Sequence, residues 1–201
     1  MARRKMAQLE VEEVRATLLD AAVRCWQRGG METMGMSDIA IEAGVARSTV
    51  YRYFPNREAL AEGLARRELA AINADMAPLL DAIDDPAERI VEGYVLALRM
   101  LPRRRLLVEL LPRQEVWTSR AMIDLGKEFL RDAVAPARAQ GRLRTDVREE
   151  LLVEWIYRIV ISLLTLPSRW VRNEDELRAT LRSLLIPVLL EPEAGEKPEE
   201  V

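Results

Sequence analysis

The stretch SDIAIEAGVARSTVYRYFPNREAL, which runs from Ser37 to Leu60, decides the fold. Within it Ala40, Gly44 and Val50 stand four and six residues apart, which is the spacing of two short helices that cross at a tight turn. A small side chain at 40 lets the helices approach, glycine at 44 allows a left-handed turn, and the apolar side chain at 50 fills the angle between them. We therefore predict a helix-turn-helix. The residues that complete its inward face are Ile39, Ala43, Val45 and Phe54.

The outward side of this unit is basic and rich in hydroxyl groups. The segment from Ala46 to Arg57 holds three arginines and no carboxylate. Such a surface is attracted to a DNA duplex, whose major groove carries hydrogen-bond acceptors and whose backbone carries phosphates. The alternative is an ordinary solvated face, since any small three-helix unit has charged residues outside. The residues that we place on this side are Arg47, Ser48, Thr49, Tyr51, Arg52, Tyr53 and Arg57.

The same stretch resembles the tetracycline-repressor (TetR) family of bacterial transcription factors. The resemblance is carried by IA and AGV between Ile39 and Val45, by STVYRYF from Ser48 to Phe54, and by PNREAL from Pro55 to Leu60. It covers Leu9 to about Arg67 well and the rest of the chain only as a helix pattern. It implies an all-α fold, with a three-helix DNA-binding domain at 1–67 and a helical domain at 68–191 that binds an effector and dimerises. The acidic tail 192–201 is predicted to be disordered.

The resemblance also implies a role for each outward residue. Tyr51, Tyr53 and Arg57 would contact phosphates, as would Thr33 or Ser37 through a hydroxyl or backbone amide. Base edges would be read by Arg47, Ser48, Thr49 and Arg52, and arginine paired to guanine is the commonest such contact. The recognition helix would run from about Arg47 to Phe54 and be stopped by Pro55.

Local signals place the neighbouring helices. Apolar positions with helical spacing predict a helix from about Val11 to Arg28 that ends at two glycines and keeps Cys25 in the core. Ser37 is placed to N-cap the next helix, with Asp38 in its first turn. Ala46 stands where the family often has serine or threonine, so the recognition helix lacks a side-chain cap, at a cost of about 1 kcal/mol. The basic arm at Arg3, Arg4 and Lys5 is either solvated or in contact with phosphate or the minor groove.

Composition excludes several classes of protein. The 201 residues are 49% apolar and 31% charged, and they include no histidine and a single cysteine. A histidine-based catalytic triad and a zinc cluster are therefore excluded, and we expect no enzyme, cofactor or metal site. The single cysteine cannot form an intrachain disulfide, which agrees with a cytoplasmic location. Neither a secretory signal nor a transmembrane helix is visible.

Charge is divided unequally along the chain. The net charge is −3, but residues 1–67 hold 11 Lys and Arg against 9 Asp and Glu, so the remainder is the acidic part. The positive field therefore lies with the helix-turn-helix. A second basic run, Arg103 to Arg105, is better explained as a solvated helix start than as another nucleic-acid site.

The C-terminal part reads as a set of helices. A helix from about Arg57 is predicted to end near Pro78, and a helix from Glu149 to Leu166 is apolar nearly all round, so it must be buried on more than one side. We expect the two closing helices to form a four-helix bundle with a second subunit, although they could instead cap a monomer core. The residues assigned to this dimer interface are Leu152, Ile156, Leu163, Leu177, Leu181, Leu185 and Val188.

The resemblance further implies an effector cavity among these helices. Each candidate could equally be plain core, and an apolar lining favours a hydrophobic effector. The candidates are Tyr94, Leu98, Trp117, Met122, Phe129, Trp155 and Ile159.

The predicted function is a homodimeric regulator, most often a repressor, that binds a palindromic double-stranded DNA operator and is released by a small, largely hydrophobic effector. The alternatives are a helical-bundle enzyme and a ligand-binding or interaction module that no longer meets DNA. Missing histidine weighs against the enzyme, because it removes the commonest general base.

Overall fold

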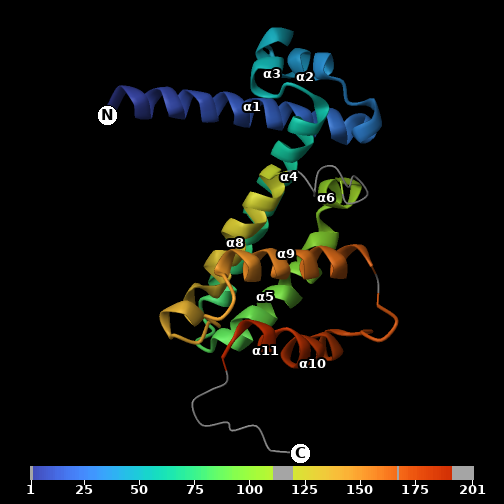
Figure 1. Cartoon of the computed structure of the whole chain (residues 1–201). Helices are drawn as coiled ribbons and strands as arrows, with labels where there is room; N and C mark the ends of the chain where they lie inside the picture. The colour runs from blue at the N-terminus through green and yellow to red at the C-terminus, as the bar shows by residue number, and fades with distance from the viewer. Residues whose placement is uncertain (1, 111–119, 167, 192–201) are drawn as a thin grey trace, which may run out of the picture. The chain divides into compact units, whose positions relative to one another are not determined.

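The structure, a computed structural model, describes residues 2–110, 120–166 and 168–191, and within the helices it leaves out the side chains of residues 2–9, 32–33, 121–122, 125, 128–129 and 132. The chain divides into two compact units, Met1–Arg67 and Glu68–Val201. In the described part the ordered elements are helices, apart from one isolated β-bridge (Figure 1). The all-α prediction is confirmed.

The N-terminal unit contains α1 (Ala2–Thr33), α2 (Met36–Ala43), α3 (Arg47–Tyr53) and the start of α4 (Arg57–Leu80). Helix α2 packs on α1 and on α3. The backbone of α1 is interrupted at Gly30, whose φ of 74° is left-handed, so the helix changes direction where glycines predict its end. The core of this unit is apolar throughout, with Leu18, Ile39, Val50 and Leu64 inaccessible to solvent and Cys25 buried beside them.

The turn between α2 and α3 has the predicted geometry. Gly44 has φ 67° and ψ 31°, and the Val45 amide donates to the Ala40 carbonyl at 3.0 Å. This positive φ favours glycine, because residues with a side chain rarely adopt a left-handed backbone. Val50 and Phe54 are buried as predicted, and the turn thereby fixes which side of α3 remains outside.

The N-cap of α2 differs from the prediction. The helix begins one residue earlier, at Met36, so the capping position belongs to Gly35 and Ser37 lies in the first turn. Asp38 does the capping from within, because its Oδ2 accepts from the Gly35 amide at 3.2 Å. Ser37 remains exposed and its hydroxyl has no role in the cap.

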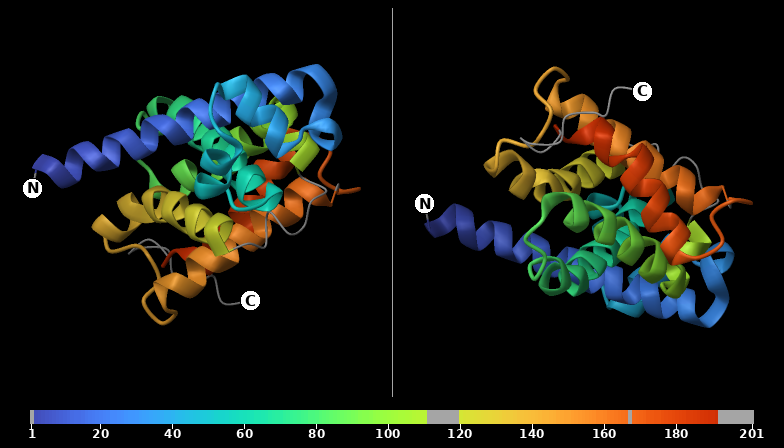
Figure 2. Two further views of the ribbon diagram at one scale, coloured as in Figure 1. Left: turned by 90° about the horizontal axis from the view of Figure 1, so that it is seen from above. Right: turned by 90° about the horizontal axis from the view of Figure 1, so that it is seen from below.

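The C-terminal unit is built around α5 (Pro86–Met100), which packs against α8 (Arg120–Ala139), α9 (Glu149–Thr165) and α10 (Glu174–Leu184), as can be followed in Figure 2. Its smaller elements are η1 (Leu101–Arg103), α6 (Arg105–Leu110) and α11 (Ile186–Leu189). Helix α4 includes Pro78 and ends two residues later, at Leu80, close to the predicted end. Helix α8 likewise continues past a proline, Pro136, and ends at Ala139.

Ion pairs join the amphipathic α10 to α5. Arg178 bonds Glu92 at 2.6 Å, Arg182 bonds Glu88 at 2.7 Å, and Arg99 pairs with Glu174. The apolar side of α10 meanwhile buries leucines against the same core. Ion pairs and buried leucines therefore both hold α10 against α5 within the C-terminal unit.

The end of the described chain pairs with the segment between α8 and α9 through a short backbone bridge. Leu143, after the left-handed turn at Gly141, forms an antiparallel bridge with Leu190. The Arg144 amide donates to the Leu189 carbonyl at 3.0 Å, and the Glu191 amide donates to the Arg142 carbonyl at 2.8 Å. Both bridge leucines are buried. In the described part of the chain, no helix has the length and apolar character that a membrane crossing requires.

Candidate nucleic-acid interface and ligand cavity

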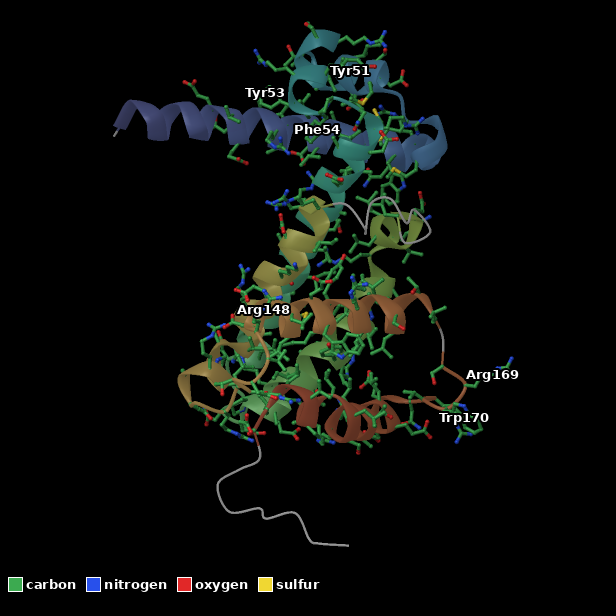
Figure 3. The ribbon with its side chains drawn as sticks, in the orientation of Figure 1. Tyr51, Tyr53, Phe54, Arg148, Arg169 and Trp170 are labelled. Carbon is green, nitrogen blue, oxygen red and sulfur yellow. The ribbon has the colours of Figure 1, made fainter. Side chains whose placement is uncertain are left out.

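Helix α3 presents the predicted basic surface. Val50 is its one buried residue, while Arg47, Ser48, Tyr51 and Arg52 are exposed. Thr49 and Tyr53 are half-buried. Ala46 occupies the N-cap position without a side-chain hydrogen bond, as predicted. The exposed side chains therefore stand on a helix whose inner side is anchored, and Figure 3 shows Tyr51 and Tyr53 on it, with Phe54 just beyond its end.

Two arginines of α3 stack on tyrosines of the same helix. The Arg47 Nη2 donates to the Tyr51 hydroxyl at 3.1 Å, and its guanidinium carbon lies 5.3 Å from the ring centroid. The guanidinium carbon of Arg52 lies 5.0 Å from the Tyr53 ring. Stacking of this kind holds a guanidinium flat while leaving its N–H edge available to an acceptor.

A shallow depression brings four of the predicted phosphate and base contacts together. It is bordered by Ser37 of α2, Arg47 and Tyr51 of α3, and Arg57 at the start of α4. The Arg57 Nη2 also donates to the Met31 carbonyl at 2.6 Å, so this arginine ties α4 to the end of α1 in addition to facing outward. The Thr33 side chain lies outside the described residues.

Sequence reasoning missed two residues that hold the end of the recognition helix. Arg15 of α1 places its guanidinium carbon 4.8 Å from the Phe54 ring centroid. Its Nη1 also donates to the Tyr53 carbonyl, at the C-terminus of α3, over 3.4 Å. On α4, Gly63 lies so close to Phe54 that a Cβ there would stand 2.8 Å from the ring. No local pattern marks either residue, because both act through contacts distant in sequence.

The C-terminal unit contains an apolar cavity of about 100 Å³. Its wall is formed by α4, α5, α8 and α9. The side chains that face it include Ile72 and Met76 of α4, Tyr94 of α5, Leu130 of α8 and Ile156 of α9. A site of this kind is the default place for a small molecule.

The predicted pocket residues need correction. Tyr94 lines the cavity, but Leu98 and Ile159 are half-buried in the surrounding core instead. Trp155 is 51% exposed, because the side of α9 that faces the cavity carries Tyr157 and Val160, and Trp155 lies on another side. Trp117 lies outside the described residues, as do the side chains of Met122 and Phe129.

The described residues of the cavity wall carry no charged side chain. The Tyr94 hydroxyl donates to the Ile156 carbonyl at 3.0 Å, and burial raises the pKa of this phenol far above its ordinary value. Burial also raises the pKa of Tyr157 to about 12. Among the described residues that line the cavity, the remaining polar side chain is Asn73, and none is Asp, Glu, Lys or Arg.

The predicted dimer-interface residues divide into two groups. Leu152, Ile156, Leu177, Leu181 and Leu185 are buried within the subunit's own core, so they cannot also be the surface that meets a second copy. This corrects the sequence prediction, which could not tell the inner from the outer side of these helices. Leu163 and Val188 are half-buried.

Other apolar side chains are exposed on the same elements. Leu151 and Trp155, four residues apart on α9, are each 51% exposed, and Leu184 at the end of α10 is 70% exposed. Trp170, in the connection between α9 and α10, is 87% exposed and projects beside Arg169 (Figure 3).

The helix-turn-helix and the chain around it are similar to known bacterial regulators. The family model for bacterial regulatory proteins of the tetR family matches residues 18–64. An uncharacterised HTH-type transcriptional regulator of Mycobacterium tuberculosis, Rv1255c, is 29% identical over 86% of this chain and 83% of the relative. The transcriptional repressor KstR of the same organism is 28% identical over 73% of this chain and 72% of its own.

Solved structures share the fold over nearly the whole length. The TetR family repressor AlkX from Dietzia, implicated in the biodegradation of n-alkanes, has a TM-score of 0.65 at 25% identity, over 87% of this chain and 94% of its own. The repressor FadR of Thermus thermophilus, solved with lauroyl-CoA, has a TM-score of 0.68 at 23% identity, over 91% and 99%. The helical C-terminal unit is therefore part of the similarity as well as the helix-turn-helix.

Proposed function

The chain belongs to the TetR family of bacterial transcriptional regulators, and from this we propose that it is a homodimeric repressor that leaves a palindromic operator when a small hydrophobic effector binds. The observation that carries the proposal is that α4 belongs to both units. Its first turns adjoin the recognition helix, and its later turns line the apolar cavity.

The outward residues of α3 would divide into two tasks on DNA. Arg47, Ser48, Thr49 and Arg52 would read base edges, because they stand on the outer side of a helix of suitable size for the major groove. Phosphates would be held by Tyr51, Tyr53 and Arg57, with Ser37 or Thr33 at the neighbouring helix end. The stacked arginines support this division, since each offers a fixed N–H edge.

The exposed apolar residues of α9 and α10 support a homodimer. Leu151, Trp155 and Leu184 are large apolar side chains that remain exposed in one subunit, and exposed apolar surface of this kind commonly marks an interface when it is contiguous. A two-fold dimer would present two recognition helices to half-sites one helical turn apart. Half-buried Leu163 and Val188 would contribute at the edge.

Effector control would pass along α4. A molecule in the cavity contacts Leu69, Ile72 and Met76, and a displacement of these turns is transmitted along one continuous helix to Arg57 and Gly63. The effector must bind the state that does not fit DNA more tightly than the state that does, otherwise it shifts nothing. A relative at 25% identity, AlkX, is implicated in n-alkane biodegradation, which agrees with an apolar effector.

Selection of binding sites from a random DNA pool tests the proposal. We expect an inverted repeat to be recovered, with an affinity that falls steeply as salt rises because phosphate contacts release counterions. Measurable turnover without DNA affinity would instead indicate an enzyme. Absence of both activities would indicate an interaction module.

A further inference from the structure

We propose that the effector is an uncharged apolar molecule, and that the cavity rejects both anionic and cationic amphiphiles of the same chain length. This inference rests on the proposed function, because it names the chemical class that the regulatory cavity takes. It follows from the wall of the cavity, from the state of its two phenols and from the contact between α8 and α9.

The described part of the wall offers no charged partner to a ligand. Its described members are aliphatic or aromatic except for Asn73, and no acidic or basic side chain is among them. A carboxylate or ammonium that enters such an environment loses its hydration without gaining an ion pair, which is strongly unfavourable. A neutral molecule of the same shape avoids this cost.

The phenols do not change this conclusion. The Tyr94 hydroxyl already donates to the Ile156 carbonyl, so its proton is in use. A tyrosine hydroxyl is ordinarily protonated at neutral pH, and burial raises the pKa of both phenols further, so neither supplies a negative charge that could hold a cation. Asn73, half-buried on α4, is a neutral polar group in this wall through which an ester or alcohol would be oriented.

The size of the cavity limits what enters without movement. A cavity of about 150 Å³ in another protein is enough for benzene, and the cavity here measures about 100 Å³. A longer molecule must therefore widen the wall. Tyr157 lies directly against Gly126 of α8, where a Cβ would stand 2.4 Å from the ring, so α8 and α9 are in close contact at the cavity edge.

The test compares three probes with one chain length on the full-length protein at neutral pH: methyl octanoate, octanoate and octylammonium. Calorimetric titration should show methyl octanoate binding at least about tenfold more tightly than either ion, because each ion is desolvated without a partner. Comparable or tighter binding of octanoate or octylammonium would overturn the inference.

A second test adds a charge to the wall and asks whether the preference among the three probes changes. Asn73→Asp nearly preserves shape and adds an anion, so octylammonium should gain affinity and methyl octanoate should lose it. Ala74→Asp, at the adjacent exposed position of α4, is the matched control and should change neither. If both variants alter the three affinities equally, the charge acts from the surface and the cavity does not select.

Operator release separates this inference from the proposed function. If octanoate alone releases the selected operator, the protein is an effector-controlled regulator and the inference about charge is wrong. If the neutral ester binds selectively while the operator is never bound, the cavity chemistry stands and the proposed function is wrong.

Discussion

Gly63→Ala should disturb the recognition helix while leaving the protein folded. The new Cβ would lie 2.8 Å from Phe54 Cε1 and 3.3 Å from Leu19 Cδ2, and the Arg15 guanidinium already lies over the Phe54 ring. Overpacking of this kind costs about 1–3 kcal/mol. Replacing glycine inside a helix returns about 1 kcal/mol, so the net loss in the free energy of unfolding is about 0–2 kcal/mol.

That loss is small beside the roughly 5–15 kcal/mol that stabilises a folded domain, so the variant should fold. The strain is instead relieved by movement of Phe54, which directly follows α3, and operator affinity should fall more than stability does. Denaturant unfolding measures the first quantity, and titration of the selected operator measures the second.

Two further variants decide whether the contact is responsible. Phe54→Leu in the Gly63→Ala background makes room for the methyl group, so the double variant should lose less stability than the two single changes predict together. Gly93→Ala is the control, because its Cβ would meet nothing closer than 3.8 Å, and it should stabilise by about 0.5–1 kcal/mol. The reasoning is refuted if Gly63→Ala is as stabilising as Gly93→Ala and binds operator normally.

Three other expectations follow from the surface residues. Arg52→Ala should relax sequence preference at one base position by about 1–3 kcal/mol, whereas Tyr53→Ala should weaken operator and random DNA alike, as competition titrations would show. Trp155→Asp, which places a charge on the exposed side of α9, should convert the dimer to monomers in light scattering. The pKa of Glu88 is held below its ordinary value of 4.5 chiefly by the hydrogen bonds from Arg182, so its stabilising contribution is complete above that pH and is lost as the pH falls below it. Arg182→Met should therefore flatten the acid side of the stability curve.

Each of these expectations has a matched control. Equal losses for Arg52→Ala and Tyr53→Ala on both kinds of DNA would contradict the division between base and phosphate contacts. Val108→Asp, at an exposed position of α6 in the same unit, should leave the dimer mass unchanged. Arg169→Met removes the same charge from an exposed loop. If the dependence of stability on acidic pH flattens equally for this variant, the role of the pair between Arg182 and Glu88 is contradicted.

The local geometry of the helix-turn-helix could be predicted because its determinants lie close together in the sequence. Gly44, Val50 and the prolines and glycines nearby specify their own backbone or their neighbours within a few residues. Arg15 and Gly63 could not be predicted, because their partner Phe54 is brought to them by the packing of α1 and α4. The cap at Gly35 could not be predicted from Ser37, because the capping hydrogen bond is accepted by the Asp38 carboxylate, three residues after Gly35.

The C-terminal unit was less predictable for a different reason. Helix α9 is apolar on most of its sides, so its periodicity does not show which side faces the core. Tyr157 and Trp155 are two residues apart and look equivalent in the sequence, yet one lines the cavity and the other is exposed. The distinction arises from the packing of α8 and α5, and only the assembled helices supply it.

The pairing of Leu143 with Leu190 limits where this polypeptide can be shortened. A version that stops before Leu189 would uncover the apolar side chain at 143 and leave the amide of Arg144 without its acceptor. A version that stops just after Glu191 would keep the bridge between Leu143 and Leu190 and both of its backbone hydrogen bonds. Tags and fluorescent labels for the assays above are therefore best joined beyond Glu191, where they leave the pairing of Leu143 with Leu190 intact.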